Sequence, residues 1–153
     1  MSGPTVVATT VAAVATGLTA GVYLAFSALV MPALAAGAPA PALAAMQRIN
    51  QLAQRPVFGS VFAAAAIGSL WVLAAPWFTG ANRQPWTTVG AALSLAAFAV
   101  TVVVNVPRNR RTAQLACSSS ADLATWKAVS ASWRWGNHVR AGCATLGLLA
   151  FVI

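Results

Sequence analysis

Acidic side chains are almost missing from this chain of 153 residues: Asp122 is its only aspartate, and it has no glutamate. One carboxylate cannot form the paired site that catalysis by two acidic residues requires. Histidine is equally scarce, and with His138 alone a three-histidine zinc site is excluded. A Ser–His–Asp triad would have to use Asp122, which falls in a predicted loop, and the chain has no G-x-S-x-G turn. Hydrolytic chemistry of these kinds is not expected.

Cysteine and nucleotide-binding motifs are also sparse. The two cysteines are Cys117, in a predicted loop, and Cys143, in a predicted membrane span, so we expect no disulfide between them. No G-x-G-x-x-G, Walker or C-x-x-C motif occurs, which leaves nucleotide and thiol redox chemistry without support. The segment 33–35 resembles a signal cleavage site. However, no Lys or Arg precedes the long apolar run before it, and we expect no cleavage.

Apolar residues dominate instead, at 59% of the chain against 7% charged residues. They fall in four blocks that approach or exceed the roughly 20 residues needed to cross a bilayer. We therefore predict an all-α membrane protein, an antiparallel four-transmembrane-helix bundle that forms a single domain over 1–153. The predicted spans are 6–30, 57–78, 86–106 and 136–153.

The basic residues predict the orientation of the chain in the membrane. A net charge of +8 can indicate nucleic acid binding, but here the cations flank the apolar blocks, so we expect no nucleic acid partner. The loops 31–55 and 107–135 are rich in Arg and Lys, whereas the middle loop carries only Arg83. The positive-inside rule therefore places those two loops in the cytoplasm and both termini outside. Membrane lipids, anionic headgroups among them, are expected partners, and self-association into a homo-oligomer is left open.

Short interfacial helices are predicted in the first and third loops. Pro32 is expected to end the first span, and an amphipathic helix to follow over 41–54. Pro107 follows the third span. A new helix, capped by Ser120, is then expected to begin at Ala121 and to lead into the last span.

Polar side chains gather at one end of the predicted bundle. In alternating spans, the ends of the first and third meet the starts of the second and fourth, and most polar residues fall there. Polar groups at membrane depth are costly and usually face a cavity or each other, so we predict a polar pocket opening toward the cytoplasmic side. The residues concerned are Tyr23, Ser27, Asn50, Arg55, Asn105, Asn109, Trp133, Asn137, His138 and Arg140.

Two of these residues allow several roles. His138 could be a structural hydrogen-bonding residue, a general base, or the lone ligand of a haem or copper. Arg140 could be a cation that reaches the membrane interface, or a clamp for an anion or a carbonyl group. Position in the sequence does not decide between these roles.

Four motifs together resemble one family. GVYLAFSALVMPAL in the first span, AMQRIN in the first loop, NVPRN after the third span and NHVR in the last span are similar to the anthrone oxygenase-like family of small four-helix membrane proteins. Many of its members have no assigned function. Two positions depart from the family pattern: Gly136 replaces a frequent aromatic residue and Ala141 a common threonine, changes that could enlarge or reshape the pocket.

The resemblance implies an oxidoreductase that oxidises a hydrophobic aromatic compound, polyketide or quinol-like, with molecular oxygen and without a metal or flavin. It implies His138 as base, with Arg140 and Asn137 beside it in catalysis. Substrate contacts would come from Tyr23, Asn50, Asn105, Asn109 and Trp133. The alternatives are a non-catalytic lipid- or quinone-binding membrane protein, and a haem or copper protein that uses His138.

Overall fold

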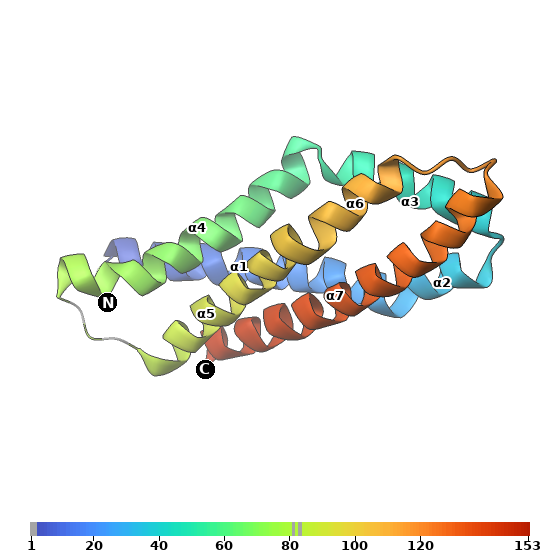
Figure 1. Ribbon diagram of the computed structural model, residues 1–153. Helices are drawn as coiled ribbons and strands as arrows, with labels where there is room; N and C mark the ends of the chain where they lie inside the picture. Colours follow the sequence, from blue (N-terminus) through green and yellow to red (C-terminus); the bar gives the residue numbers. More distant parts are fainter. Residues whose placement is uncertain (1–2, 81, 83) are drawn as a thin grey trace.

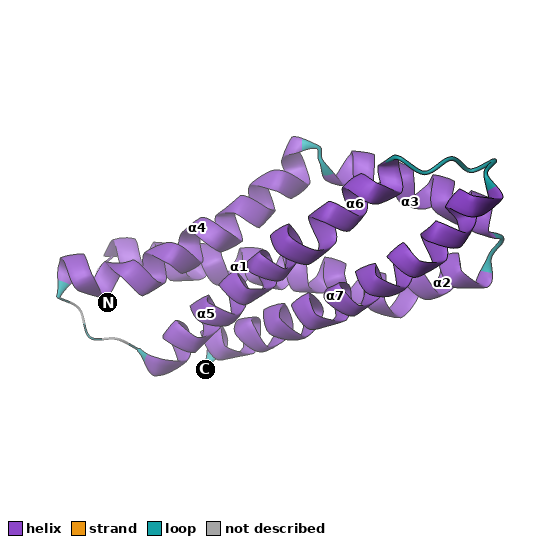
Figure 2. Ribbon diagram, viewed as in Figure 1, coloured by secondary structure: helices purple, strands orange, loops and turns teal. Residues whose placement is uncertain are grey.

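Helices make up nearly all of the computed structural model, which describes residues 3–80, 82 and 84–153 (Figures 1 and 2). No strand occurs among these residues. Arg83, on which the expected charge of the middle loop rests, lies outside them. The helices, together with two π-helical segments named η1 and η2, are α1 (Gly3–Ala25), η1 (Phe26–Val30), α2 (Met31–Ala36), α3 (Pro39–Ala53), α4 (Pro56–Thr79), α5 (Pro85–Val100), η2 (Thr101–Asn105), α6 (Val106–Ala113) and α7 (Ser120–Val152).

Four long helices pack around a common centre (Figure 1). α1 packs against α4 and α7, and α5 packs against the same two helices. Three continuous stretches are long and apolar enough to cross a membrane: Gly3–Ala36, Pro56–Thr79 and Pro85–Ala113. The protein is thus an all-helical membrane protein. α7 is not among the three, so the fourth span that the sequence predicts is not established by length and composition.

Side-chain size is distributed as a lipid environment requires. Large apolar residues such as Leu18, Ile67 and Leu146 are exposed, whereas alanine, serine and threonine fill most of the space between the helices. Small residues allow helix backbones to approach closely where no hydrophobic effect draws them together. A Cβ atom on Gly90 of α5 would lie 3.0 Å from the carbonyl oxygen of Gly147 of α7, so this contact depends on the missing side chains.

Pro32 does not end its helix, contrary to the prediction, and the helix that contains Pro107 likewise continues past the proline. A π-helical turn precedes each of them, and there the N–H of Met31 donates to the carbonyl of Phe26 and that of Val106 to Thr101. This longer spacing adds one residue to the turn, which relieves the clash and the missing donor that proline brings to a regular helix. The chain therefore stays helical to Ala36 and to Ala113.

The two predicted interfacial helices have different outcomes. The first exists as α3, which begins at Pro39. The second is wrong as a separate element, because it is the first part of the continuous helix α7. No proline or glycine interrupts residues 120–135, so nothing breaks the helix before the predicted span. The cap is Ser119 rather than Ser120, since the Ser119 hydroxyl accepts a hydrogen bond from the Asp122 N–H at 3.2 Å.

α3 lies across one end of the bundle, where it contacts α6 and α7 (Figure 1). Gln47 of α3 fixes this position, because its side-chain amide donates to the carbonyls of Thr112 and Leu115 at 3.0 and 2.9 Å. An apolar cluster closes the same end, formed by Met31, Leu43, Met46, Leu115, Trp126 and Trp133. The helix ends beneath α3 are therefore held in a defined arrangement.

Candidate active site

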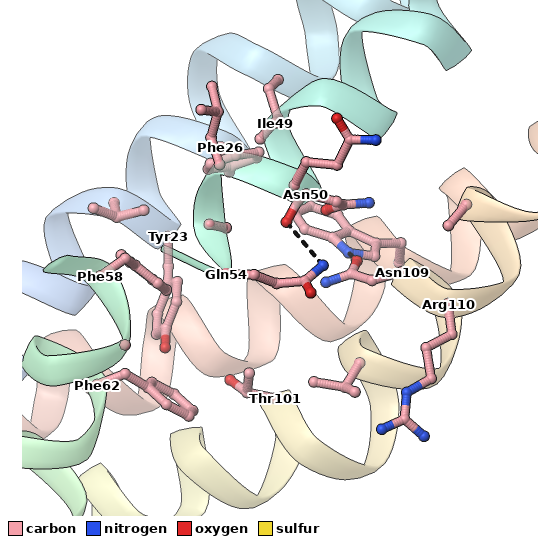
Figure 3. A pocket seen from close by; sticks show the side chains of 18 of the residues that line it. Tyr23, Phe26, Ile49, Asn50, Gln54, Phe58, Phe62, Thr101, Asn109 and Arg110 are labelled. Atoms are coloured by element: carbon pink, nitrogen blue, oxygen red, sulfur yellow. Dashed lines mark hydrogen bonds between the residues drawn. The ribbon is translucent and has the colours of Figure 1, made fainter. Parts of the chain in front are cut away.

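A cavity of about 710 Å³ lies beneath α3, between α1, α4, α6 and α7 (Figure 3). Its walls are largely apolar and include five aromatic rings from four elements. Polar groups project between them at a few places, and α6 contributes Arg110 at the exposed rim. Such a space suits a flat, apolar molecule with a small number of polar groups. The rings belong to Tyr23, Phe26, Phe58, Phe62 and Trp133, and the polar groups are those of Gln47, Asn50, Gln51, Gln54, Thr101, Asn109, Arg110 and Arg140.

Arg140 brings a positive charge to the wall of this cavity, and its side chain is only 7% exposed. Its guanidinium donates from Nε and Nη2 to the Asn137 side-chain oxygen at 3.0 and 2.9 Å, and from Nη1 to the Thr101 hydroxyl at 3.3 Å. These partners are neutral. The only acidic side chain of the protein, Asp122, instead accepts a hydrogen bond from the Ala116 N–H. No carboxylate side chain therefore balances the charge of Arg140.

Two aromatic rings flank the same guanidinium. Its central carbon lies 4.1 Å from the centroid of the Tyr23 ring and 5.2 Å from that of Trp133. Ring faces attract cations without neutralising them. The charge is thus held in place while its capacity to bind an anion is kept.

Asn137 is the residue that fixes Arg140. Its side-chain oxygen accepts both hydrogen bonds from the guanidinium, while its amide nitrogen donates to the Tyr23 carbonyl at 2.8 Å and to the Ser27 hydroxyl at 2.7 Å. Asn137 thereby joins α7 to α1 at the level of the cavity.

Asn105, the last residue of η2, and Asn109, one turn later in α6, hold Trp133. The Asn105 amide donates to the Trp133 carbonyl at 3.2 Å, and the indole N–H of Trp133 donates to the Asn109 side chain at 2.7 Å. The Trp133 ring also contacts Phe26, with ring centroids 5.4 Å apart. Asn105 is fully buried and its side-chain oxygen has no partner among the described residues. It acts on the cavity through Trp133.

The predicted site residues separate into three groups. Those that line the cavity are Tyr23, Asn50, Asn109, Trp133 and Arg140. Asn105 and Asn137 lie behind the wall and hold lining residues in place. His138 does neither: its side chain is exposed and its Nδ1 is hydrogen bonded to the Ser27 hydroxyl at 2.9 Å. The expected convergence of His138 with the others in one cavity is therefore wrong, because a residue next to the inward Asn137 is turned about 100° around the helix.

Several lining residues were not predicted from the sequence. Phe58 and Phe62 stand four residues apart on α4, with ring centroids 6.4 Å from each other, and Phe62 stacks on Phe98 at 4.6 Å. Their spacing was a usable signal, because residues at i and i+4 share a helix face. Thr101 and Gln54 were harder to predict as lining residues. Thr101 begins a π-helical turn, and Gln54 lies in the short connection after α3.

Comparison with known proteins identifies the family. The family model described as anthrone oxygenase matches residues 46–150. The chain belongs to the anthrone oxygenase family. The matched range contains the lining residues Asn50, Asn109, Trp133 and Arg140, whereas Tyr23 lies before it. No curated protein and no solved structure matches the chain.

Gly136 stands where the anthrone oxygenase family often has an aromatic residue. This difference does not enlarge the cavity. Gly136 is buried against η2, where an added Cβ would lie 2.5 Å from a methyl group of Val104 and 3.1 Å from the Asn105 side-chain oxygen. Neither Gly136 nor Ala141 lines the cavity. The small residue at 136 instead allows α7 to approach η2 closely, which brings the Trp133 carbonyl to Asn105.

The described residues contain no group of three or more His, Cys, Asp or Glu side chains that could hold a metal ion. The residues lining the cavity include no carboxylate, imidazole, thiol or amine among those described. What the cavity offers to a ligand is an unbalanced guanidinium, amide and hydroxyl groups, and aromatic walls. This set favours a flat molecule that carries, or develops, a negative charge on oxygen.

Proposed function

We propose that the protein is a membrane-embedded oxygenase that oxidises a hydrophobic aromatic substrate with molecular oxygen in the cavity beneath α3. The observation that carries the proposal is Arg140, a nearly buried cation without a carboxylate partner in an aromatic cavity. The family membership supports the same chemistry. The substrate class would be an anthrone-like compound, with an acidic methylene group between two rings and a carbonyl group opposite.

The proposed reaction begins with loss of a proton from that methylene group. The resulting charge spreads onto the carbonyl oxygen, which Arg140 stabilises through the guanidinium donors. Because no described lining residue is a conventional base, the proton passes to water at the open side of the cavity. The electron-rich anion then transfers electrons to oxygen. One oxygen atom replaces the two methylene hydrogens as a new carbonyl group and the other leaves as water, so that one substrate and one oxygen molecule give one quinone and one water.

His138 has a different place in this proposal from that implied by the resemblance. It is linked to Arg140 by a chain of hydrogen bonds, from its Nδ1 to the Ser27 hydroxyl, from Ser27 to the Asn137 amide, and from Asn137 to the guanidinium. We therefore treat His138 as a positioning residue. The role of base and the role of haem or copper ligand stay predictions.

The membrane arrangement belongs to the same proposal. α7 packs along α1 and α5, both of which lie in candidate spans, so the part of α7 from 136 to 153 would cross the bilayer beside them as a fourth, antiparallel span. The buried Arg140 lowers the hydropathy of this helix without facing lipid. Both termini would lie outside, with the α3 end and its cavity toward the cytoplasm.

The test is oxygen uptake by the purified protein with an anthrone, together with product analysis under ¹⁸O₂. We expect equal consumption of anthrone and oxygen, one labelled oxygen atom in the quinone, and no effect of a metal chelator. Arg140→Gln should lower kcat/KM on the order of 10²–10³-fold, the usual effect of removing a donor to a developing oxyanion. Asn137→Asp should also lower kcat/KM, because it places a carboxylate that competes with the substrate oxyanion against the guanidinium.

Melting temperatures measured beside the rates control for folding. Oxidation by the wild-type protein no faster than in buffer would contradict the oxygenase, and tight binding of an anthrone without turnover would favour the alternative of a quinone- or lipid-binding protein. Unchanged kcat/KM in a folded Arg140→Gln variant would show that Arg140 takes no part in the reaction.

A further inference from the structure

The polar side chains of the cavity fall into two sets. The inner set surrounds the guanidinium of Arg140 and includes Thr101, whose hydroxyl accepts one of its hydrogen bonds. The outer set belongs to α3, to the connection after it and to α6, and several of its members are exposed. The proposed reaction uses only the inner set. The outer set consists of Gln47, Asn50, Gln51, Gln54, Asn109 and Arg110.

Arg110 belongs to the face of α6 that lines the cavity. The lining residues of this helix are spaced so that they share one side of it. Arg111, the next residue, is turned about 100° around the helix and does not line the cavity. Of these two adjacent cations, only Arg110 can therefore meet a ligand there. The lining residues of α6 are Val106, Asn109, Arg110 and Ala113.

The guanidinium of Arg110 is available to a ligand. Among the residues that the structure describes, it has no hydrogen-bond or ion-pair partner. Arg108, on the same helix, is occupied instead, because it donates to the Ser132 hydroxyl and to the Val104 carbonyl, each at 2.7 Å. Asp122, the only acidic side chain of the protein, does not line the cavity. Arg110 is thus a second cation on the cavity that no carboxylate side chain balances.

Two asparagines add hydrogen-bond donors to the outer set. The side-chain oxygen of Asn109 accepts from the indole N–H of Trp133, which leaves the amide N–H groups of Asn109 as donors. The amide nitrogen of Asn50 is buried and has no partner among the described residues. Figure 3 shows both asparagines on the side of the cavity where Arg110 lies, away from the rings of α4. Several donors beside one positive charge favour an anionic oxygen group.

We infer that the substrate carries a carboxylate, which binds to Arg110 while the oxyanion formed in the reaction lies on Arg140. A carboxylate is the group that a planar guanidinium binds through two parallel hydrogen bonds. At the exposed rim it stays partly hydrated, and the apolar walls receive the rings. A cavity of about 710 Å³ has room for three fused rings with this substituent. The inference rests on the proposed function, because it specifies the substrate of the same site.

Binding of two matched ligands tests the carboxylate subsite without turnover. Anthraquinone-2-carboxylate and anthraquinone-2-carboxamide have nearly the same shape, and only the first is charged. Titration of the protein in a non-ionic detergent, followed by quenching of tryptophan fluorescence, gives a Kd for each ligand. We expect the carboxylate to bind about three- to tenfold more tightly than the carboxamide, between the value of an exposed ion pair and that of a hydrogen-bonded charge.

Arg110→Gln should bring the two Kd values together, and Arg110→Glu should reverse the preference. Arg111→Gln is the matched control, because it removes the same charge from an adjacent exposed position that does not line the cavity, and it should keep the wild-type preference. Melting temperatures verify that each variant is folded. Equal Kd values in the wild type, or a preference that survives Arg110→Gln, would overturn the subsite. A preference that only Arg140→Gln abolishes would place the carboxylate on the inner cation and overturn it as well.

Oxygen uptake separates this inference from the proposed function. In the wild type, kcat/KM with anthrone-2-carboxylate should exceed kcat/KM with anthrone, and Arg110→Gln should lower the ratio of the two values while Arg111→Gln keeps it. Turnover of both compounds with a ratio that does not depend on Arg110 would overturn the subsite and leave the oxygenase standing. Binding of the carboxylate that depends on Arg110, in a protein that consumes no oxygen, would support a site for aromatic acids and sink the proposed function.

Discussion

The groups around Arg140 determine what its side chain can do. A cation in a membrane helix has two common situations, a carboxylate partner or a position near the interface. Here the nearest acceptors are the neutral oxygens of Asn137 and Thr101, and the rings of Tyr23 and Trp133 cover the guanidinium. Binding of the oxyanion proposed above would offset the energetic cost of this burial.

His138 gives a prediction at the same scale. Because the side chain is exposed and reaches Arg140 only through Ser27 and Asn137, His138→Ala should lower kcat less than about tenfold, the value of one net hydrogen bond. His138→Gln should restore most of the rate, since its amide can replace the hydrogen bond to Ser27. Rates are compared at equal amounts of folded protein.

The general base implied by the resemblance would produce a different result for His138. If His138 were the base, His138→Ala would lower kcat on the order of 10²–10⁴-fold, and His138→Gln would not restore the rate. A loss of that size in a folded His138→Ala protein would contradict the positioning role and restore the histidine to the chemistry.

At the scale of the helices, the two π-helical segments decide which side chains face the cavity. η1 and η2 each precede a proline and shift the helical register by one residue. Thr101, the first residue of η2, meets Arg140, and Ser27, in η1, meets Asn137. A regular helix through either segment would turn the residues that follow it by about 100° relative to those before it.

Close packing of α7 on η2 gives a prediction for Gly136. Gly136→Ala places a methyl group against Val104, which is stiff at χ1, and should destabilise the protein by about 1–3 kcal/mol, the usual cost of overpacking. Gly142→Ala is the matched control on the same helix, because its Cβ would meet no atom within 4 Å. Thermal unfolding in detergent measures both. A Gly136→Ala protein as stable as the control would show that η2 yields to the added group.

For the whole molecule, the polar end beneath α3 and the apolar remainder define a direction across the membrane. The positive-inside rule predicts that this end faces the cytoplasm, because Arg and Lys are concentrated there. The cavity would then open toward the cytoplasmic interface.

Cysteine labelling tests this direction with a matched pair that leaves the basic residues unchanged. Gln84 and Gln114 are both exposed, the first in the middle connection and the second after α6. With Cys117 and Cys143 replaced by serine, Gln84→Cys should react with an impermeant reagent in intact cells, and Gln114→Cys only after permeabilisation. The reverse pattern would invert the topology, and labelling of both sites in intact cells would contradict the four-span arrangement.

The sequence by itself determined the membrane character, the helical class, three of the spans and the family, because these depend on composition, on the length of apolar runs and on local motifs. It also indicated five lining residues, since polar groups at membrane depth gather at one end. The tertiary structure alone decided the rest: that π-helical turns carry two helices past their prolines, that α7 is one helix, and that His138 points outward. These features depend on how the faces of different helices meet, and a one-residue change in register, invisible in the pattern of a single helix, redirects every side chain that follows.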